Sequence, residues 1–378
     1  MSESIIKEYS DRYDRYLRDE SSEEGSAEWI AFPETTDEVS EVLGELADRG
    51  IPYVIQGALT GIKGKAVPHG GCIVNLSRMN HISEVSCSED GEWYIDAEAG
   101  ATLEAIRNKI SKHSGGPQLF WPPAPSEETA TIGGIAASAA FGMNIAGWGD
   151  TDHYILPLKT VWNDCITELR LRLLEKKGEV WGTAFFFEDE DMAAKFADFA
   201  AENSESADGA KLTALEFIGS AAMELVESSR ETLPAISAVP PAPEGTKGII
   251  YIEIEGEEDA IEELLLGLAE ASAEYGADPD EAWSFMGETE TERFYAYRHA
   301  VTEAATQKMA AVHAEDRRLH LISRDIRDES ISFSELMKMS RDEYESAGAT
   351  AAICGCAASR DVRILALTED FDTYSSIR

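Results

Sequence analysis

The chain has 378 residues, enough for two domains or for one large domain with a sizeable core. Its 72 acidic and 32 basic residues give a formal net charge of −40, which argues against nucleic acid or an anionic membrane as partner because phosphates would be repelled. The five cysteines, an odd number in a long chain, do not indicate a disulfide framework. The acidity fits a salty or alkaline cytoplasm, a docking face for a basic partner or, most simply, solubility.

The N-terminal region lacks the basic start and the apolar segment of a signal peptide. No apolar run approaches the ~20 residues that are needed to span a bilayer. We therefore expect a cytoplasmic protein without direct membrane insertion, which a partner protein could still tether to a membrane. Residues 1–27 are expected to form a polar helix followed by a linker rich in Ser and Glu.

The first ordered elements are predicted to be a helix, a buried strand and a glycine-rich turn. Thr35 and Glu38 have the spacing of a capping box, and apolar residues then recur on one helical face up to Gly50. Residues 51–55 read as a buried strand, and the small-residue turn QGALTGIKG at 56–64 follows it. A phosphate-binding turn follows a strand in the same way.

Two more strands and a helix are predicted before the segment that is richest in small residues. The strands are expected near 72–76 and 93–97, and Thr102 is a plausible N-cap for a helix over 103–110. The stretch 122–142, PPAPSEETATIGGIAASAAFG, is then crowded with Gly, Ala, Ser and Thr. Such density lets a backbone approach something flat or phosphorylated.

Two small-residue loops in this order resemble the flavin-binding half of the vanillyl-alcohol-oxidase/PCMH superfamily of FAD-linked oxidoreductases. The nearest likeness is the branch of the glycolate oxidases and D-lactate dehydrogenases, and the LSRMN sequence at 76–80 and AGATL at 99–103 extend it. The alternative is a pair of ordinary glycine-rich turns. The resemblance implies an α+β fold.

The implied domains follow the N-terminal helix and linker. A PCMH-type FAD-binding domain with two subdomains is expected over 28–175, and a truncated or degenerate cap domain over 176–378. The cap is expected to have an antiparallel sheet with helices on one face, and a loop rich in Pro and Gly at 235–248. Its C-terminal end either stays in the cap or returns to the FAD-binding domain.

The resemblance also implies noncovalent FAD, with the diphosphate on backbone amides of the turn and the isoalloxazine and ribityl chain along the central stretch. Gln56 stands where the family often has arginine, Ala58 replaces a glycine, and the segment before Cys165 is shorter than in homologues, which weakens the enclosure of the adenosine. Neither His69 nor Cys72 falls on a covalent attachment position. The expected cofactor-binding residues are Gln56, Gly57, Ala58, Leu59, Thr60, Gly61, Pro125, Ser126, Thr131, Ile132, Gly133, Gly134, Ala137, Ser138 and Ile166.

The substrate site is expected near residues 294–303, which resemble the family's FRHAVPE signature. Arg298 is expected to bind a substrate carboxylate, because a guanidinium fork suits two oxygens. The alternative is a helix-surface arginine paired with Glu292 or Glu303. The candidates for the proton acceptor are His299, His313 and His320, and we name His299 with Arg298 as the catalytic pair.

The family's histidine motif near the C-terminus is replaced. The matching residues 355–363 carry Cys356, Asp361 and Arg363 at the three histidine positions. Cys354 and Cys356 form a lone Cys-Gly-Cys without a completing pair at zinc spacing, so no metal site is predicted.

Two functions of different kinds remain. The first is an FAD-dependent dehydrogenase of a small 2-hydroxy acid such as glycolate or D-lactate, which passes hydride to flavin N5 and electrons to an iron–sulfur or electron-transfer flavoprotein partner. The second is a catalytically degenerate flavin-binding or electron-relay subunit of a larger oxidoreductase complex. The retained loops and Arg298 favour the first, and the replaced histidine motif favours the second.

Overall fold

The computed structural model describes most of the chain, and the described part forms two compact units. The first unit comprises Met1–Gly142 and Asp150–Lys176, and the second comprises Met143–Gly149 and Lys177–Arg378. The residues described are 5–21, 23–123, 125, 127–161, 165–204, 209–313 and 320–368.

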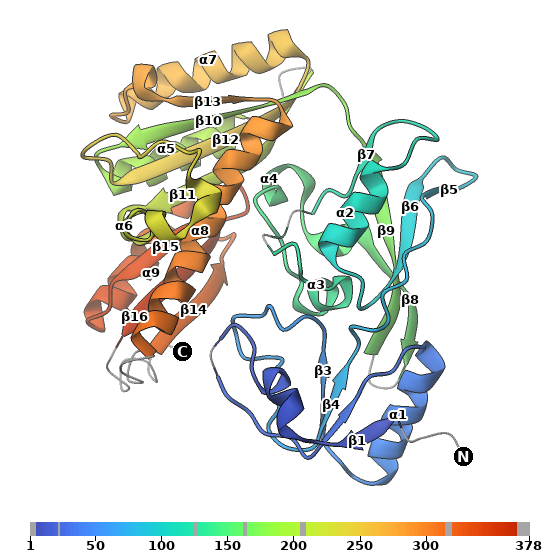
Figure 1. Ribbon diagram of the computed structural model, residues 1–378. Coiled ribbons are helices and arrows are strands. Elements are labelled where there is room, and N and C mark those ends of the chain that lie inside the picture. The colour runs from blue at the N-terminus through green and yellow to red at the C-terminus, as the bar shows by residue number, and fades with distance from the viewer. Residues whose placement is uncertain are drawn as a thin grey trace. The chain divides into compact units, whose positions relative to one another are not determined.

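The first unit begins with a four-stranded sheet whose order is β1-β2-β4-β3. Strand β1 is antiparallel to β2, whereas β2 and β3 both run parallel to β4. These strands are β1 (Ile6–Glu8), β2 (Trp29–Ala31), β3 (Tyr53–Gln56) and β4 (Cys72–Asn75). Because three parallel strands share one direction, the segments that leave β3 and β4 meet at the same edge of the sheet (Figure 1).

The predicted helix after β2 is confirmed as α1 (Thr36–Asp48), with Val39, Val42, Leu43 and Leu46 buried. Half of the predicted capping box forms, because the Thr35 side chain accepts a hydrogen bond from the Glu38 amide. The Glu38 carboxylate instead accepts from the amide of Glu34, one residue before the N-cap.

The N-terminal segment differs from the expected polar helix and linker. It contributes β1 and a 3₁₀ helix, η1 (Asp11–Leu17), on which Tyr16 is buried. Tyr16 packs with Ile30 and Ile73 of β2 and β4. The many charged residues of this segment predicted that it would be solvent-exposed. Its aromatic residues, however, supply enough apolar surface to dock it on the sheet.

The first unit also contains a five-stranded sheet of order β5-β6-β9-β7, with β8 paired to β9. Thr102 caps α2 as predicted, since its side chain accepts a hydrogen bond from the amide of Ala105. The elements are β5 (Ser86–Cys87), β6 (Trp93–Glu98), α2 (Leu103–Ser111), β7 (Leu119–Phe120), α3 (Ile132–Ser138), η2 (Thr151–Tyr154), β8 (Ile155–Val161) and β9 (Cys165–Glu175).

The second unit is built on a seven-stranded antiparallel sheet of order β13-β10-β12-β11-β15-β16-β14. This sheet, together with the mixed four-stranded sheet and the antiparallel five-stranded sheet of the first unit, confirms the predicted α+β class. Its strands are β10 (Glu179–Phe187), β11 (Ala210–Gly219), β12 (Gly248–Gly256), β13 (Trp283–Met286), β14 (His320–Arg327), β15 (Ala351–Cys356) and β16 (Asp361–Thr368).

Helices cover both faces of this sheet, and not one face as the sequence suggested (Figure 1). One face packs against α5 (Glu190–Asn203), α7 (Glu258–Glu274) and α9 (Phe333–Ser346), and the other against α6 (Ser220–Ser228) and α8 (Glu288–His313). The reason lies in the strands, because β10 and β12 are apolar on both faces: Phe185 points to the first face and Phe186 to the second. The remaining short helices of this unit are α4 (Ile145–Trp148), η3 (Arg230–Thr232), η4 (Pro234–Ile236) and η5 (Pro279–Glu281).

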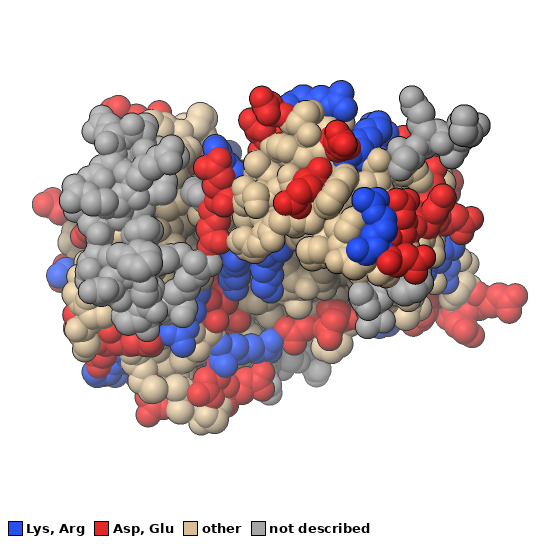
Figure 2. Space-filling view, turned by 90° about the horizontal axis from the view of Figure 1, so that it is seen from below, with Lys and Arg blue, Asp and Glu red and all other residues tan. Residues whose placement is uncertain are grey.

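The acidic side chains do not gather into a single patch on the face of the molecule drawn in Figure 2. Asp and Glu lie in several groups, with Lys and Arg between them. Exposed ion pairs also occur in both units, such as Arg18 with Glu24 in the first and Lys338 with Asp342 in the second. No helix in the described part of the chain is long and apolar enough to cross a membrane.

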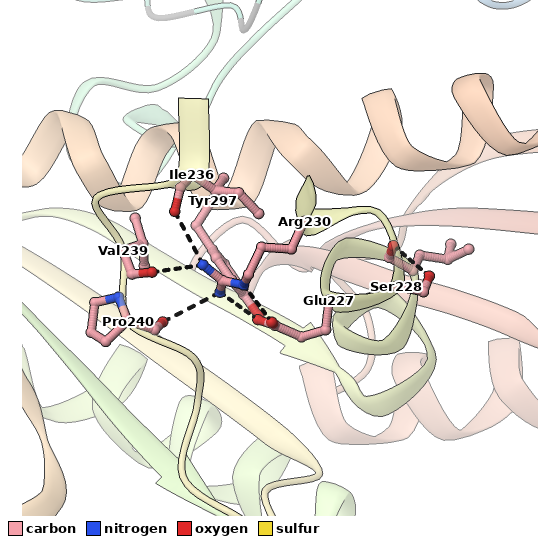
Figure 3. Close-up of polar contacts among 8 residues, drawn as sticks. Glu227, Ser228, Arg230, Ile236, Val239, Pro240 and Tyr297 are labelled. Atoms are coloured by element: carbon pink, nitrogen blue, oxygen red, sulfur yellow. Dashed lines mark hydrogen bonds and ion pairs between the residues drawn. The ribbon is translucent and has the colours of Figure 1, made fainter. Parts of the chain in front are cut away.

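The predicted loop rich in Pro and Gly is held by one arginine (Figure 3). The guanidinium of Arg230 donates two hydrogen bonds to the Glu227 carboxylate, at 2.6 and 2.7 Å. It also donates to three loop carbonyls, those of Ile236, Val239 and Pro240. The Tyr297 hydroxyl of α8 donates to the same carboxylate at 3.1 Å, so this ion pair fastens the loop to two helices.

We expect Arg230→Lys to loosen this loop, because one ammonium cannot serve a carboxylate and three carbonyls together. The loss is expected to be about 1–3 kcal/mol of local stability, measured as faster hydrogen–deuterium exchange in a peptide that covers residues 233–247. Arg293→Lys is the matched control, because Arg293 is half exposed and its ion pair with Glu290 is long, at 4.0 Å. Equal exchange in the two variants would show that Arg230 does not hold the loop.

Candidate functional site

The glycine-rich turn leaves the end of β3 in a conformation that its sequence alone does not favour. Leu59 has a φ angle of 67°, in the left-handed region that residues other than glycine rarely adopt. Its side chain packs against the small core around Tyr16, Ile30 and Ile73. This packing compensates for the backbone strain and fixes the direction in which the turn continues.

The turn lies against the central small-residue stretch within the first unit. A Cβ atom at Gly57 would overlap the Thr131 hydroxyl, so any other residue at this position requires Thr131 or the turn to shift. The Thr131 hydroxyl is also 3.2 Å from where a Cβ of Gly134 would lie. The Asn75 side chain, at the end of β4, donates to the Gly57 carbonyl at 3.0 Å. Two loops that are far apart in the sequence thus meet around one threonine.

The central stretch is also fixed from a second side. The Gly133 amide donates to the Ala99 carbonyl at 2.9 Å, and the Ile132 amide donates to the Ala101 carbonyl at 2.8 Å. A Cβ at Gly133 would lie 2.7 Å from the Cβ of Ala99, so this approach also requires glycine. The small residues therefore serve close backbone packing as well as any ligand.

The other expected cofactor residues fall into an exposed group and a covered group. Ala58, Gly61, Gly134, Ala137 and Ser138 are at least partly exposed, and Thr60 is half-buried. Pro125 and Ile132 are buried, Ile166 is half-buried on β9 opposite Thr160, and Ser126 lies outside the described residues. The small accessible side chains leave the backbone of both loops within reach of a ligand.

Gln56 has a structural role in addition to the one expected of it. Its side-chain amide donates to the carbonyls of Tyr16 and Ala66, at 2.9 and 2.7 Å, and so ties the N-terminal segment to the turn. Its Oε1 atom is buried without a hydrogen-bond partner among the described residues. A buried acceptor of this kind beside the turn suits a bound group that donates a hydrogen bond.

Two cysteines of this unit, Cys72 and Cys165, are poor nucleophiles for a covalent flavin bond. Burial raises the pKa of the Cys72 thiol to about 12 and that of Cys165 to about 11. The thiolate is the reactive form, so both side chains stay inert at neutral pH. Together, the glycine contacts, the accessible loop backbone and the buried Gln56 acceptor fit a bound FAD.

Arg298 lies on α8 and is buried, with 8% of its surface exposed. Its Nε atom donates to the Glu216 carboxylate on β11 at 2.7 Å, so the expected alternatives with Glu292 or Glu303 on the helix surface do not form. Burial raises the pKa of Glu216, and the positive charge of Arg298 opposes this shift. The guanidinium is therefore held in place by a partner that the sequence did not reveal.

The residues that replace the histidine motif lie beside this pair on the sheet. Cys356 is opposite Glu216 on one side and opposite Asp361 on the other. Arg363 donates to the Asp325 carboxylate at 2.8 Å. We call Glu216, Arg298, Asp325, Asp361 and Arg363 the buried charge cluster, in which Glu216, Arg298 and Asp361 are buried and Asp325 and Arg363 are half-buried. Its strand members face the same side of the sheet.

Asp361 is the member of the cluster whose protonation changes near neutral pH. Burial, followed by the charges of Asp325 and Glu216, raises its pKa from 3.8 to about 7. The sequence had marked Asp361 only as a replaced histidine. An acid at a position where a proton acceptor is expected was the one signal that could have identified it.

His299 is half-buried on α8, with its ring 6.4 Å from that of Tyr295. The Tyr295 hydroxyl contacts the buried Glu253 carboxylate at 2.9 Å and the Asn144 side chain at 2.6 Å. The side chains of His313 and His320 lie outside the described residues. In the described part of the chain, no three His, Cys, Asp or Glu side chains gather as metal ligands.

Comparison with known proteins assigns the first part of the chain. Residues 27–166 match the family model described as an FAD binding domain. Over 136 residues the chain is 32% identical to D-lactate dehydrogenase of Archaeoglobus fulgidus, covering 36% of this chain and 29% of the relative. It is 31% identical over 135 residues to glycolate oxidase subunit GlcD of Bacillus subtilis, covering 35% of this chain and 27% of the relative. The chain therefore spans less than a third of the length of these curated relatives.

Solved structures extend the likeness to the whole fold. The 4-ethylphenol oxidase of Gulosibacter chungangensis aligns with a TM-score of 0.66 at 14% identity, over 96% of this chain and 79% of the other. A p-cresol methylhydroxylase structure aligns with a TM-score of 0.68 at 13% identity, over 98% of this chain and 80% of the other. At this identity the likeness shows the fold, and it extends over far more of the chain than the matches to the curated relatives.

We expect Gly57→Ala to abolish flavin binding, because the added methyl group overlaps the Thr131 hydroxyl and forces the two loops apart. The measurement is the flavin absorbance that copurifies with the protein or is regained with added FAD. Gly44→Ala is the matched control: Gly44 lies within α1 with open space around it, so this variant keeps its flavin and gains up to about 1 kcal/mol of stability. Normal flavin content in Gly57→Ala would contradict the contact.

We expect Asp361→Asn to stabilise the protein more at pH 8 than at pH 5. Between pH 4 and 7 the folded protein keeps the Asp361 proton that the unfolded chain releases, so this group lowers the free energy of unfolding as the pH rises. The free energy of unfolding, measured by urea denaturation, is expected to be higher in the variant than in the parent, and this difference is expected to grow by about 1–3 kcal/mol from pH 5 to pH 8. Asp90→Asn, in an exposed turn, controls for loss of a carboxylate. A difference that stays constant with pH would contradict the raised pKa.

Proposed function

We propose that this chain, which carries an FAD-binding domain and the fold of the vanillyl-alcohol-oxidase/PCMH family, is an FAD-dependent oxidoreductase that oxidises a small 2-hydroxy acid in the cytoplasm. The observation that carries the proposal is the contact between Gly57 and Thr131, which joins the two loops expected to hold the cofactor. The match of residues 27–166 to an FAD binding domain supports the cofactor, and the similarity of 136 and 135 residues of the chain to D-lactate dehydrogenase and to GlcD supports the choice of substrate class.

In this proposal the backbone of the turn binds the diphosphate, and the central stretch supports the flavin ring. Backbone amides supply hydrogen-bond donors without adding a charge, which suits a turn whose residues 57–61 include no cationic side chain. The bound FAD would supply the hydride acceptor. The inert Cys72 and Cys165 thiols support noncovalent binding.

The substrate would be held and deprotonated by the second unit. Arg298 binds the carboxylate, with Glu216 as the residue that positions the guanidinium. Arginine cannot accept the hydroxyl proton because its pKa is far too high. His299 is the proton acceptor that the sequence favours, and Asp361 is a second acceptor in the same cluster as Arg298, with a pKa of about 7. Electrons then pass to an iron–sulfur or electron-transfer flavoprotein partner.

One observation favours a second candidate function. Arg298 is already paired with Glu216, and Arg363 with Asp325, so these two guanidinium groups have protein carboxylates as partners without a substrate. A buried pair that is satisfied in this way can be purely structural. The chain would then be a flavin-binding or electron-relay subunit of a larger complex.

The spectrum of the purified protein separates the two candidates. A flavin band that bleaches anaerobically with D-lactate or glycolate would establish the oxidoreductase and its substrate class. A flavin band that neither acid bleaches, but that a reduced protein partner does, would establish the relay subunit. Absence of a flavin band after incubation with FAD would refute both.

We expect the double variant Arg298→Met, Glu216→Gln to retain flavin and to lose at least about 100-fold in the rate of flavin reduction by substrate. Both charges are removed together because a single change leaves a buried unpaired charge. Arg324→Met, which breaks a half-exposed pair with Glu343, is the control for loss of an arginine. An unchanged rate in the double variant would exclude Arg298 as the carboxylate anchor.

A further inference from the structure

A cavity of about 440 Å³ lies in the first unit, where β3 and β4 end. The turn contributes Gly57, Ala58 and Leu59, and the segment after β4 contributes Ser77. The opposite wall comes from the N-terminal segment, within residues 15–20. Ligands of open sheets with parallel strands bind outside the carboxyl ends of the strands, which is where this cavity lies.

Asp19 is a buried carboxylate on this wall with an unused oxygen. Only 8% of the residue is exposed, and its Oδ1 atom accepts a hydrogen bond from the amide of Ser21 at 2.9 Å. Its Oδ2 atom has no partner among the residues that the structure describes, and it lies 3.7 Å from where a Cβ of Gly61 would be. Leaving a buried carboxylate oxygen unsatisfied is costly, so the site suits a ligand that donates a hydrogen bond there.

The same wall also carries cationic side chains. Arg15 donates to the Tyr16 hydroxyl and lies over its ring, with the guanidinium carbon 4.6 Å from the centroid. Arg18 lines the cavity and pairs with Glu24 in an exposed ion pair. Two acids, Asp19 and Glu20, line the same cavity, so Arg15 and Arg18 are the groups on its wall that can attract phosphate.

The two ends of the turn have different neighbours. Gly57 touches Thr131 of the central stretch, and Gly61 lies beside Asp19 of the N-terminal segment. A ligand with a diphosphate on the turn therefore has the flavin wall at one end and residues 15–20 at the other. In FAD the diphosphate separates the flavin from the adenosine.

We propose that residues 15–20 form the adenosine side of the cofactor site, which makes the site selective for FAD over FMN; this inference rests on the proposed function. Asp19 accepts hydrogen bonds from the ribose hydroxyls, and Arg15 and Arg18 face the phosphate nearest the adenosine. The docking of η1 through Tyr16 and the hydrogen bond from Gln56 to the Tyr16 carbonyl hold this wall against the turn.

The test is a titration of the full-length protein, freed of flavin, with FAD and with FMN, which lacks the adenosine half. Asp19→Ala is expected to raise the Kd for FAD at least tenfold, and Arg15→Gln at least threefold, while the Kd for FMN changes less than twofold. Arg12→Gln is the matched control, because Arg12 lies on the same 3₁₀ helix with its guanidinium over Tyr13 and not on the cavity wall.

Retained FMN binding also shows that a variant is folded. Asp19→Asn keeps the shape of the side chain and one acceptor oxygen, and it is expected to fall between the parent and Asp19→Ala. Unchanged FAD binding in both Asp19→Ala and Arg15→Gln, or an equal loss of FAD and FMN in both, would overturn the inference and leave the proposed function standing. A parent protein that binds neither flavin would refute the proposed function, and the inference with it.

Discussion

The architecture of the first unit depends on a steric constraint, the absence of a side chain at Gly57. Because no Cβ separates the turn from Thr131, a loop after β3 and a loop after β7 can share one contact surface. On the other side of the central stretch, the absence of a side chain at Gly133 likewise allows close packing against Ala99. A very acidic chain gains by this arrangement, since backbone amides can hold an anionic cofactor while few cations are available.

The second unit differs from the first, because its candidate site consists of charged side chains that are buried, and not of closely packed backbone. Five ionisable residues of the buried charge cluster lie on one sheet face and α8, with three acids against two arginines. Burial of Asp361, followed by the charges of the neighbouring acids Asp325 and Glu216, is the physical reason why its pKa is raised to about 7. Replacement of a histidine motif by Cys, Asp and Arg has therefore left a titrating group at this place in the fold, so loss of the motif is not the same as loss of proton chemistry.

Local patterns in the sequence predicted local structure well. The helix cap at Thr35, the cap at Thr102 and the small-residue loops depend on short-range spacing, and they appeared at the expected residues. Contacts between distant segments were not predictable in this way. Arg298 pairs with Glu216, 82 residues away, because the strand order brings β11 beneath α8, and no spacing rule encodes that order. The sequence did not predict helices on the second face of the sheet. Strands that are buried on both faces do not alternate apolar and polar residues, so their sequence does not show which faces are covered.

The N-terminal segment shows how composition can mislead about docking. Its many charges predicted a solvated helix and linker, yet Tyr13 and Tyr16 pack their rings near Phe32, and the arginines extend along these rings. Aromatic residues between charges supply both an apolar anchor and a polar rim. A segment anchored in this way can present Asp19 to a cavity with its carboxylate already desolvated. The carboxylate is desolvated when the protein folds. A ligand that donates a hydrogen bond to it therefore does not have to displace water from it, and the free energy of that hydrogen bond contributes fully to binding.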